Sequence, residues 1–230
     1  SQSIGMLKDL KSSYSIVSEV FEEASDILSY DLWKITKNGP ESKINDTEFT
    51  QPIMLCSTLA VWKIWNDEGG ESPIYMAGHS FGEYTALCAS GAIKFKDAVN
   101  LVKKRALCMK AAPKGKMAAL IGIDLHKLKS ICEENTLSEV SIANLNAPGQ
   151  IVISGTEDGV SQLSDLALSN NAKKVIPLPV SVAAHSSLMK EQSIIFEEFI
   201  ADININKPSI PVVNNVDVVT EENQKKIKDA

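Results

Sequence analysis

Hydrophobic residues near the start of the chain recur at steps of three and four, which is the spacing of one face of an α-helix. The residues on this face are Leu7, Leu10, Tyr14, Val17, Phe21, Ala24 and Leu28. Gly39-Pro40 then breaks the chain. Thr50 with Pro52 marks the start of a second long helix, which closes at Gly69-Gly70. The pattern therefore predicts two long helices in this part of the chain.

A short apolar run at 74–77 precedes the segment Gly78-His79-Ser80-Phe81-Gly82, and helix-forming residues follow from Glu83 to Ala89. This order predicts a strand, a tight turn and a helix. A further helix is expected from about Lys96 to Ala112. Strands that alternate with helices are typical of an α/β fold.

The periodicity changes after Pro113-Lys114-Gly115-Lys116. Apolar runs then predict strands at 117–123, 140–144, 150–154 and 173–180. Asp124 and Thr156 each stand where a helical pattern begins, as capping residues do. The resulting order, β-α-β-β-α-β, is that of a ferredoxin-like unit. We therefore predict a small domain over 116–180.

After this small domain, His185 precedes a helical stretch through Leu188 and Phe199, and strand character resumes from Pro211 to Val219. The large domain is therefore expected in two pieces, 1–115 and 181–230, which flank the small one. A length of 230 residues suits this organisation, because a domain averages about 150 residues.

The composition is that of an ordinary globular protein, with 44% hydrophobic and 23% charged residues, and it excludes collagen-like, coiled-coil and disordered classes. The net charge of −6 argues against nucleic-acid binding. Neither a membrane-length apolar run nor a basic-then-apolar leader is found, so no membrane association is expected.

Four cysteines fall singly inside apolar stretches, with no CxxC pair and no histidine at metal-ligand spacing: Cys56, Cys88, Cys108 and Cys132. We therefore expect buried, reduced thiols, no metal site and a cytoplasmic protein.

The segment from Gly78 to Gly82 matches G-x-S-x-G, the nucleophile elbow. The two glycines are expected to allow a sharp strand-to-helix turn that lifts the Ser80 hydroxyl to the helix N-terminus. Free N–H groups and the partial positive charge there favour an oxyanion. The pattern predicts a catalytic serine, and an ordinary tight turn is the alternative.

A nucleophilic serine needs a base, and the chain has three histidines. His126 falls in a polar helix and is expected on the surface. His79 adjoins Ser80, but neighbours in a tight turn point apart. His185 is the better candidate for the base, against the alternative that it merely begins a helix.

Arg105 occupies an apolar helix face with Ala98, Val102, Met109 and Ala112. An arginine is rarely buried without a partner. It is either a two-pronged clamp for a substrate carboxylate or a structural, snorkelling side chain.

These residues resemble the malonyl-CoA:acyl-carrier-protein transacylases of bacterial type II fatty acid synthesis. The matching motifs run in the family's order over nearly the whole chain: Thr50-Gln51-Pro52, Gly78–Tyr84 as GHSFGEY, Arg105 with Met109, Met117–Gly122, Asn144–Gly155 as N-x-N-x-PGQ-x-VISG, His185–Met189 as H-S-x-L-M, and Pro211–Asn215 as PVVNN.

The resemblance implies an α/β-hydrolase-like large domain with a parallel sheet and an inserted ferredoxin-like small domain. It implies that Ser80 attacks the thioester of malonyl-CoA and His185 takes its proton. It also implies that the backbone N–H of Phe81 stabilises the oxyanion and that Arg105 holds the malonyl carboxylate. Further substrate contacts are implied for His79, Gln51, Asn144 and Asn146.

The malonyl acceptor implied by the family is the phosphopantetheine thiol of acyl carrier protein, and no bound cofactor is required. Because acyl carrier protein is acidic, one cluster of lysines is a candidate docking surface, with a merely solvated face as the alternative: Lys103, Lys104, Lys110, Lys114 and Lys116.

The family's pattern extends past both ends of this sequence. It begins with a strand and a PGQGSQ loop, whose first glutamine is the second oxyanion donor, and it continues beyond Pro211–Asn215. The sequence therefore resembles an internal piece. Since losing one such donor costs about 100- to 1000-fold in turnover, a 230-residue product is expected to be nearly inactive alone.

Two other functional classes stay open from the residues alone. A serine acyl hydrolase or thioesterase would add an acid between Ser80 and His185, and several acids occur there. A catalytically silent module that binds a carrier protein is the other. Burial of Arg105 would argue against a hydrolase of neutral esters.

Overall fold

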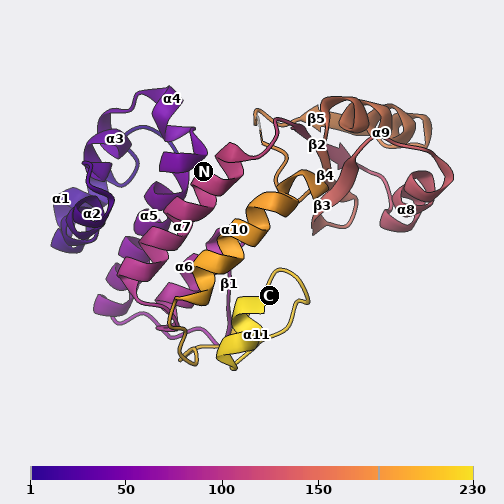
Figure 1. Ribbon diagram of the computed structural model, residues 1–230. Coiled ribbons are helices and arrows are strands. Elements are labelled where there is room, and N and C mark those ends of the chain that lie inside the picture. Colours follow the sequence, from indigo (N-terminus) through magenta and orange to yellow (C-terminus); the bar gives the residue numbers. More distant parts are fainter. Residues whose placement is uncertain (1, 181, 230) are drawn as a thin grey trace. The chain divides into compact units, whose positions relative to one another are not determined.

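The computed structural model describes residues 2–180 and 182–229 (Figure 1). These residues form two compact units. The first unit comprises the chain up to Leu107 and from Phe196 onward, and the second comprises Cys108–Ile195. The domain limits expected from the sequence lie at 115/116 and 180/181, so the two divisions differ at both boundaries, and the sequence-based limits stay a prediction.

The first unit begins with the short helices α1 (Lys8–Ser13) and α2 (Ser15–Leu28). A single continuous helix was expected here, and that expectation is wrong at Tyr14, whose extended backbone (φ −132°, ψ 117°) separates the two helices. The apolar face itself is confirmed in α2, where its predicted residues Val17, Phe21, Ala24 and Leu28 are buried, together with Val20. The unpredicted helices α3 (Leu32–Asn38) and α4 (Glu41–Ile44) follow on either side of Gly39-Pro40.

The second long helix, α5, spans Thr47–Asp67 and starts earlier than expected. Asp46 caps it, since its carboxylate accepts a hydrogen bond from the N–H of Glu48 at 3.0 Å. Pro52 therefore lies inside the helix rather than at its start. Pro52 and Gln51 are both buried, so this turn of α5 faces the core of the first unit.

Two short parallel strands connect distant parts of the first unit. Met76 in β1 (Met76–Ala77) pairs with Val212 in β6 (Val212–Val213), and Ala77 pairs with Val213. The predicted strands at 74–77 and 211–219 are longer than these, because Ile74 and the residues after Asn215 are exposed. Helix α6 (Gly82–Ala89) packs against both strands, so the first unit has the parallel pairing and covering helix of an α/β fold (Figure 1).

The core of the first unit is built from large aliphatic and aromatic side chains of its helices. Helix α7 (Phe95–Ala111) contributes to it, and the C-terminal helix α11 (Gln224–Asp229) adds Ile227. The fully buried side chains include Phe21, Leu32, Ile53, Leu55 and Leu101.

The second unit contains β2 (Lys116–Ile121), α8 (Leu125–Glu134), β3 (Val140–Ala147), β4 (Gln150–Gly155), α9 (Glu157–Ser169) and β5 (Lys174–Pro177). Its strands form an antiparallel sheet in the order β3-β4-β2-β5. The predicted order of strands and helices is confirmed. Both predicted caps are confirmed as well: Asp124 accepts from the N–H groups of His126 and Lys127, and Thr156 accepts from that of Gly159.

All four cysteines are free thiols, as expected. Cys56 and Cys108 are buried, whereas Cys88 and Cys132 are half-buried, so the expected burial is complete for two of them. Burial raises the pKa of the Cys88 thiol to about 12. Within residues 2–180 and 182–229, no helix has the length and apolar character needed to cross a membrane.

Candidate active site

Ser80 lies in a tight turn between β1 and α6. Its backbone has a φ of +54°, in the left-handed region that residues with side chains seldom adopt. The N–H of Gly82 donates to the carbonyl of His79 at 3.0 Å, and that of Glu83 donates to the carbonyl of Ser80 at 3.1 Å. The predicted strand, turn and helix are therefore all present. A left-handed nucleophile at the start of a helix is the geometry that G-x-S-x-G requires.

The two glycines of the turn have different roles. A Cβ atom on Gly78 would lie 1.9 Å from the carbonyl carbon of Gly82 and 2.4 Å from the nitrogen of Glu83. Only glycine lets the end of β1 approach the start of α6 so closely. A Cβ atom on Gly82 would meet nothing within 4 Å. The expectation that both glycines serve the turn is therefore wrong for Gly82.

This difference gives a paired prediction. Gly78→Ala should destabilise the protein by about 1–3 kcal/mol, because backbone atoms must shift to accept the methyl group. Gly82→Ala is the matched control and should leave stability unchanged or slightly higher, since alanine favours a helix over glycine by up to about 1 kcal/mol. Thermal unfolding measures both, at roughly 2–4 °C per kcal/mol for a chain of this size. Equal effects of the two substitutions would contradict the assignment of the close approach to Gly78.

The backbone N–H of Phe81 is the candidate oxyanion donor. The N–H groups of Gly82, Glu83 and Tyr84 each donate to the carbonyl three residues earlier. In the part of the chain that the structure describes, the N–H of Phe81 has no acceptor. An oxyanion next to Ser80 would therefore find an available N–H donor at the positive end of a helix.

Arg105 on α7 contacts Ser80 directly. Its Nη2 atom donates a hydrogen bond to Ser80 Oγ at 2.8 Å, and its Nη1 atom donates to Gln51 Oε1 at 3.1 Å. Gln51 is buried on α5, where its Nε2 atom donates to Thr47 Oγ1 at 2.9 Å. The three predicted residues Ser80, Gln51 and Arg105 are thus brought together within the first unit.

The guanidinium of Arg105, which is the chain's sole arginine, is partly buried. Burial lowers the pKa of Arg105 from its ordinary value, and the hydroxyl of Tyr84 acts in the opposite sense. Burial likewise raises the pKa of Tyr84. The partners Ser80, Gln51 and Tyr84 are all neutral groups. A guanidinium held by hydroxyl and amide groups can also bind a carboxylate.

Asn215, which the sequence reasoning left without a role, contacts both sides of the turn. Its Nδ2 atom donates to the carbonyl of Gly78 at 2.8 Å, and its Oδ1 atom accepts from the N–H of Ser80 at 3.3 Å. Glu83 in turn accepts hydrogen bonds from both nitrogen atoms of Asn215. The sequence does indicate a role for both residues, because each stands inside a motif: Glu83 in GHSFGEY and Asn215 in PVVNN.

Three further predicted site residues belong to the second unit. His185 has a φ of +59°, is exposed, and precedes the 3-10 helix η1 (Ser187–Met189) and the helix α10 (Lys190–Ala201). Asn144 and Asn146 lie on β3, the first half-buried and the second exposed. The roles predicted for these residues, and for the exposed His79 in the turn, stay predictions. His126 is exposed on α8, as expected.

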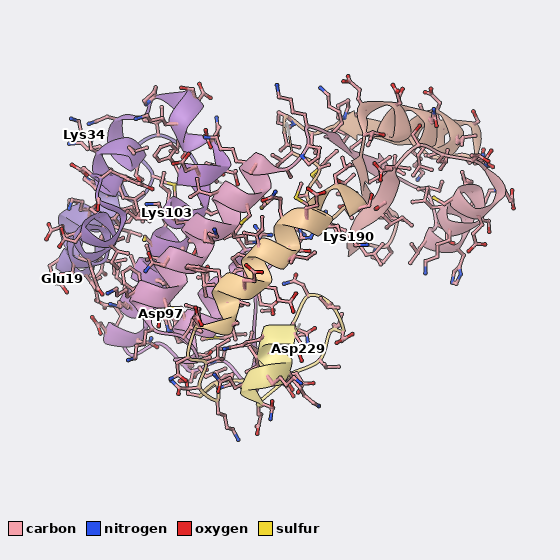
Figure 2. The ribbon with its side chains drawn as sticks, viewed as in Figure 1. Glu19, Lys34, Asp97, Lys103, Lys190 and Asp229 are labelled. Carbon is pink, nitrogen blue, oxygen red and sulfur yellow. The ribbon has the colours of Figure 1, made fainter. Side chains whose placement is uncertain are left out.

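The lysines of the predicted docking surface divide between the units. In the first unit, Lys103 lies on α7 (Figure 2), and its Nζ atom donates to the carbonyl of Leu28 at 3.4 Å. Lys104 lies over the ring of Phe199. In the second unit, Lys116 pairs with Glu157 at 3.9 Å. Lys103, Lys104 and Lys116 thus have intramolecular partners. The role of the five lysines in docking stays a prediction.

Comparisons with known proteins agree on one family. The model of the acyl transferase domain matches residues 1–229. The chain is 45% identical over 234 residues to the malonyl CoA-acyl carrier protein transacylase of Escherichia coli (strain K12), covering 100% of this chain and 76% of that protein. It is also similar to the solved structure of an acyl carrier protein S-malonyltransferase from Vibrio cholerae, with a TM-score of 0.96, 43% identity, and coverage of 100% and 76% of the two chains. A third match is a malonyl-transacylase in complex with its type II PKS acyl-carrier protein, with a TM-score of 0.96, 40% identity, and coverage of 100% and 75%.

Proposed function

The chain belongs to the acyl transferase family of malonyl-CoA:acyl carrier protein transacylases, and from this premise we propose that it moves a malonyl group from CoA to the phosphopantetheine thiol of acyl carrier protein. One observation supports malonyl as the acyl group. The guanidinium of Arg105 lies 2.8 Å from the Ser80 hydroxyl, so a carboxylate on the acyl chain would meet a cation next to the nucleophile.

The transfer proceeds in two half-reactions through an acyl-serine. Ser80 Oγ attacks the thioester carbonyl, and its proton passes to the base, for which His185 is the candidate. The carbon–sulfur bond then breaks, and the CoA sulfur leaves with that proton. The phosphopantetheine thiol attacks the new ester in the same way, and Ser80 regains its hydroxyl. No metal or redox cofactor takes part in this scheme, and malonyl-CoA is the substrate.

The negative charge that develops on the carbonyl oxygen needs donors that are already in place. We assign the N–H of Phe81 to this role, supported by its lack of an acceptor in the described residues and by its position at the start of α6. The left-handed backbone of Ser80 supports its role as nucleophile, because such strain is concentrated at functional sites.

Arg105 is assigned to the malonyl carboxylate, with Gln51 as the residue that orients it. Gln51 holds the Nη1 side of the guanidinium through its own bond to Thr47. A planar guanidinium fixed on one side can present its remaining donors to both carboxylate oxygens. A hydrolase of neutral esters has no use for a cation in this place, so the geometry favours the transferase over the thioesterase. Substrate contacts from His79, Asn144 and Asn146 complete the proposed site.

For the architecture, we infer a ferredoxin-like small domain inserted into an α/β-hydrolase-like large domain. The sheet order β3-β4-β2-β5, with every neighbouring pair antiparallel and with α8 and α9 between its strands, supports the small domain. The strand-turn-helix at Ser80 supports the large one. A cytoplasmic location is supported by the four free thiols.

Intact-mass measurement tests the proposed function. Here and in the activity tests below, the protein is the full-length one, with any residues that lie outside 1–230. Mixing it with malonyl-CoA should add one malonyl group to the chain, and adding phosphopantetheinylated acyl carrier protein should remove it. A hydrolase would instead release malonate and CoA continuously with water as the acceptor. A silent module would give neither mass change nor CoA release, and either result would contradict the proposal.

A further inference from the structure

We propose that Asn215 and Glu83 are a pair of positioning residues that hold the Ser80 turn in its reactive conformation. This inference deepens the proposed function, since it concerns the same nucleophile, but it does not depend on the identity of the acyl group. Neither residue touches the reacting atoms in the proposed mechanism. Their action is on the backbone that carries Ser80.

The topology explains how a residue from the far end of the chain reaches the turn. The parallel register pairs Ala77 with Val213, so continuing it by two residues places Asn215 beside His79. The peptide groups on either side of His79 are those that the Asn215 carboxamide joins, namely the carbonyl of Gly78 and the N–H of Ser80. The carboxamide therefore connects these two peptide groups through one donated and one accepted hydrogen bond.

A carboxamide is suited to this task because it has a donor and an acceptor at one end of a short side chain. The carbonyl of Gly78 needs the donor, and the N–H of Ser80 needs the acceptor. The N–H of Ser80 is held at a left-handed residue, where an L-amino acid does not stay without support from its surroundings. Asn215 provides such support at the nucleophile itself.

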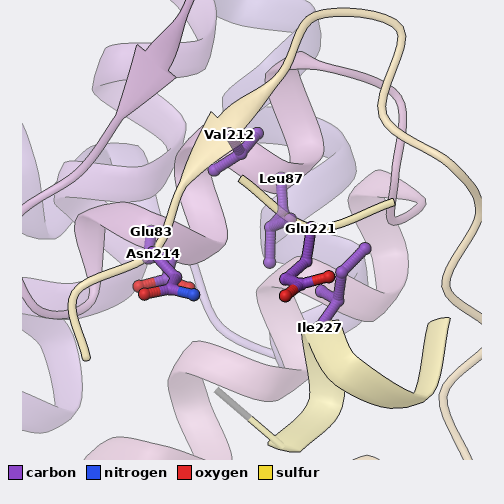
Figure 3. Close-up of a pocket in the computed structure, with 6 residues that line it drawn as sticks. All are labelled: Glu83, Leu87, Val212, Asn214, Glu221 and Ile227. Carbon is purple, nitrogen blue, oxygen red and sulfur yellow. The ribbon is translucent and has the colours of Figure 1, made fainter. Parts of the chain in front are cut away.

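Glu83 determines which way the carboxamide points. Its Oε2 atom accepts from the backbone N–H of Asn215 at 2.9 Å and also from the side-chain Nδ2 atom. Since a carboxylate only accepts, it keeps the Nδ2 end of Asn215 toward itself and the Oδ1 end toward Ser80. Glu83 on α6 and Asn214, the residue that precedes Asn215 after β6, line the same pocket (Figure 3). The Oε2 atom of Glu83 is thus engaged by Asn215.

The test uses two readouts on the same variants. A fluorophosphonate reports the reactivity of Ser80 without any carboxylate or CoA, and malonyl-CoA reports kcat and KM of the transfer. Asn215→Ala should lower both the rate of phosphonylation and kcat by about 10- to 100-fold, as expected for the loss of one or two hydrogen bonds near a charge. KM should stay within about threefold, because no substrate contact is removed.

Variants of the partner separate the roles within the pair. Glu83→Gln keeps an oxygen acceptor and should lose less than Glu83→Ala. The double variant of Asn215→Ala and Glu83→Ala should lose little more than either single one, because residues that act through one network are not additive. Asn215→Asp preserves the shape, so it serves where the alanine variant folds poorly. Asn215→Asp should show the same fall in phosphonylation rate and kcat. It loses both N–H donors of the carboxamide and places a negative charge next to the Glu83 carboxylate.

Asn223→Ala is the matched control, since Asn223 is a carboxamide in the same C-terminal segment. Its Oδ1 atom caps α11 by accepting from the N–H groups of Lys225 and Lys226. This variant should lose thermal stability but keep the parental phosphonylation rate. Parental rates in both Asn215 variants, a rise in KM at constant kcat, or an equal fall in Asn223→Ala would each overturn the inference. A parent that reacts with the fluorophosphonate but transfers no malonyl group would refute the proposed function and leave this test intact.

Discussion

Replacing Ser80 with alanine is expected to abolish acyl-enzyme formation while leaving the fold in place. Removal of a serine nucleophile typically costs on the order of 10⁴- to 10⁶-fold in turnover. The conformation of the turn should be retained. It depends on glycine at position 78, which has no Cβ atom, and on the hydrogen bonds of the Asn215 carboxamide to Gly78 and Ser80. Alanine also carries the same Cβ atom as serine, so it adds no strain at a φ of +54°.

Intact mass after mixing with malonyl-CoA measures this outcome, and thermal unfolding reports the fold. Ser72→Ala is a suitable control, since Ser72 is exposed and precedes β1. The parent and the control should gain a malonyl group, and Ser80→Ala should gain none. Labelling that persists in Ser80→Ala would show that another residue is the nucleophile.

Replacing Arg105 with alanine should lower kcat/KM for malonyl-CoA by about 100-fold or more. A charge-assisted hydrogen bond in a partly buried site contributes about 1.5–3 kcal/mol, and each 1.4 kcal/mol is tenfold in rate. Acetyl-CoA has no carboxylate, so the substitution removes no contact from it, and its use should hold steady or rise. Arg105→Lys should recover little, because an ammonium cannot make the forked contact.

The quantity to compare is the ratio of the two specificity constants in each variant. Lys104→Ala is the matched control, because it removes a cation from the neighbouring position of α7, where Lys104 lies over Phe199. It should leave the ratio at the parental value. Equal losses for malonyl-CoA and acetyl-CoA in Arg105→Ala would mean that the arginine is structural, and the malonyl assignment would then rest on the family alone.

Two helix caps, which act within a few residues, were predicted correctly from the sequence. Asp124 and Thr156 cap their helices because a short oxygen-bearing side chain reaches the next N–H groups whatever surrounds it. The break at Tyr14 had no such signal, since the apolar face continues on both sides of it. Pro52 misled the prediction for a related reason: proline favours the first turn of a helix, yet Asp46 starts α5 one turn earlier.

The same distinction between local and long-range signals applies to the residues of the candidate site. Ser80 could be predicted as a site residue because the turn's spacing is local, and Arg105 because a charged residue interrupts an apolar face. Asn215 could not be assigned a role, since its bond to Ser80 depends on how β1 and β6 pair across the length of the chain. Whether Gly78 or Gly82 is sterically required depends on the approach of two backbone segments, which identical letters in a motif do not reveal.

The hydrogen bond between Arg105 and Ser80 also affects the proposed transfer. The guanidinium donates at 2.8 Å to the hydroxyl that we propose as the nucleophile. A hydroxyl that accepts a bond from a cation has less electron density to offer a carbonyl carbon or a stray electrophile. In the proposed mechanism, a malonyl carboxylate would compete for that cation and release the oxygen as it binds, whereas an acyl chain without a carboxylate would leave the hydroxyl restrained. Selection of the acyl group would then be an exchange of hydrogen-bond acceptors at Arg105.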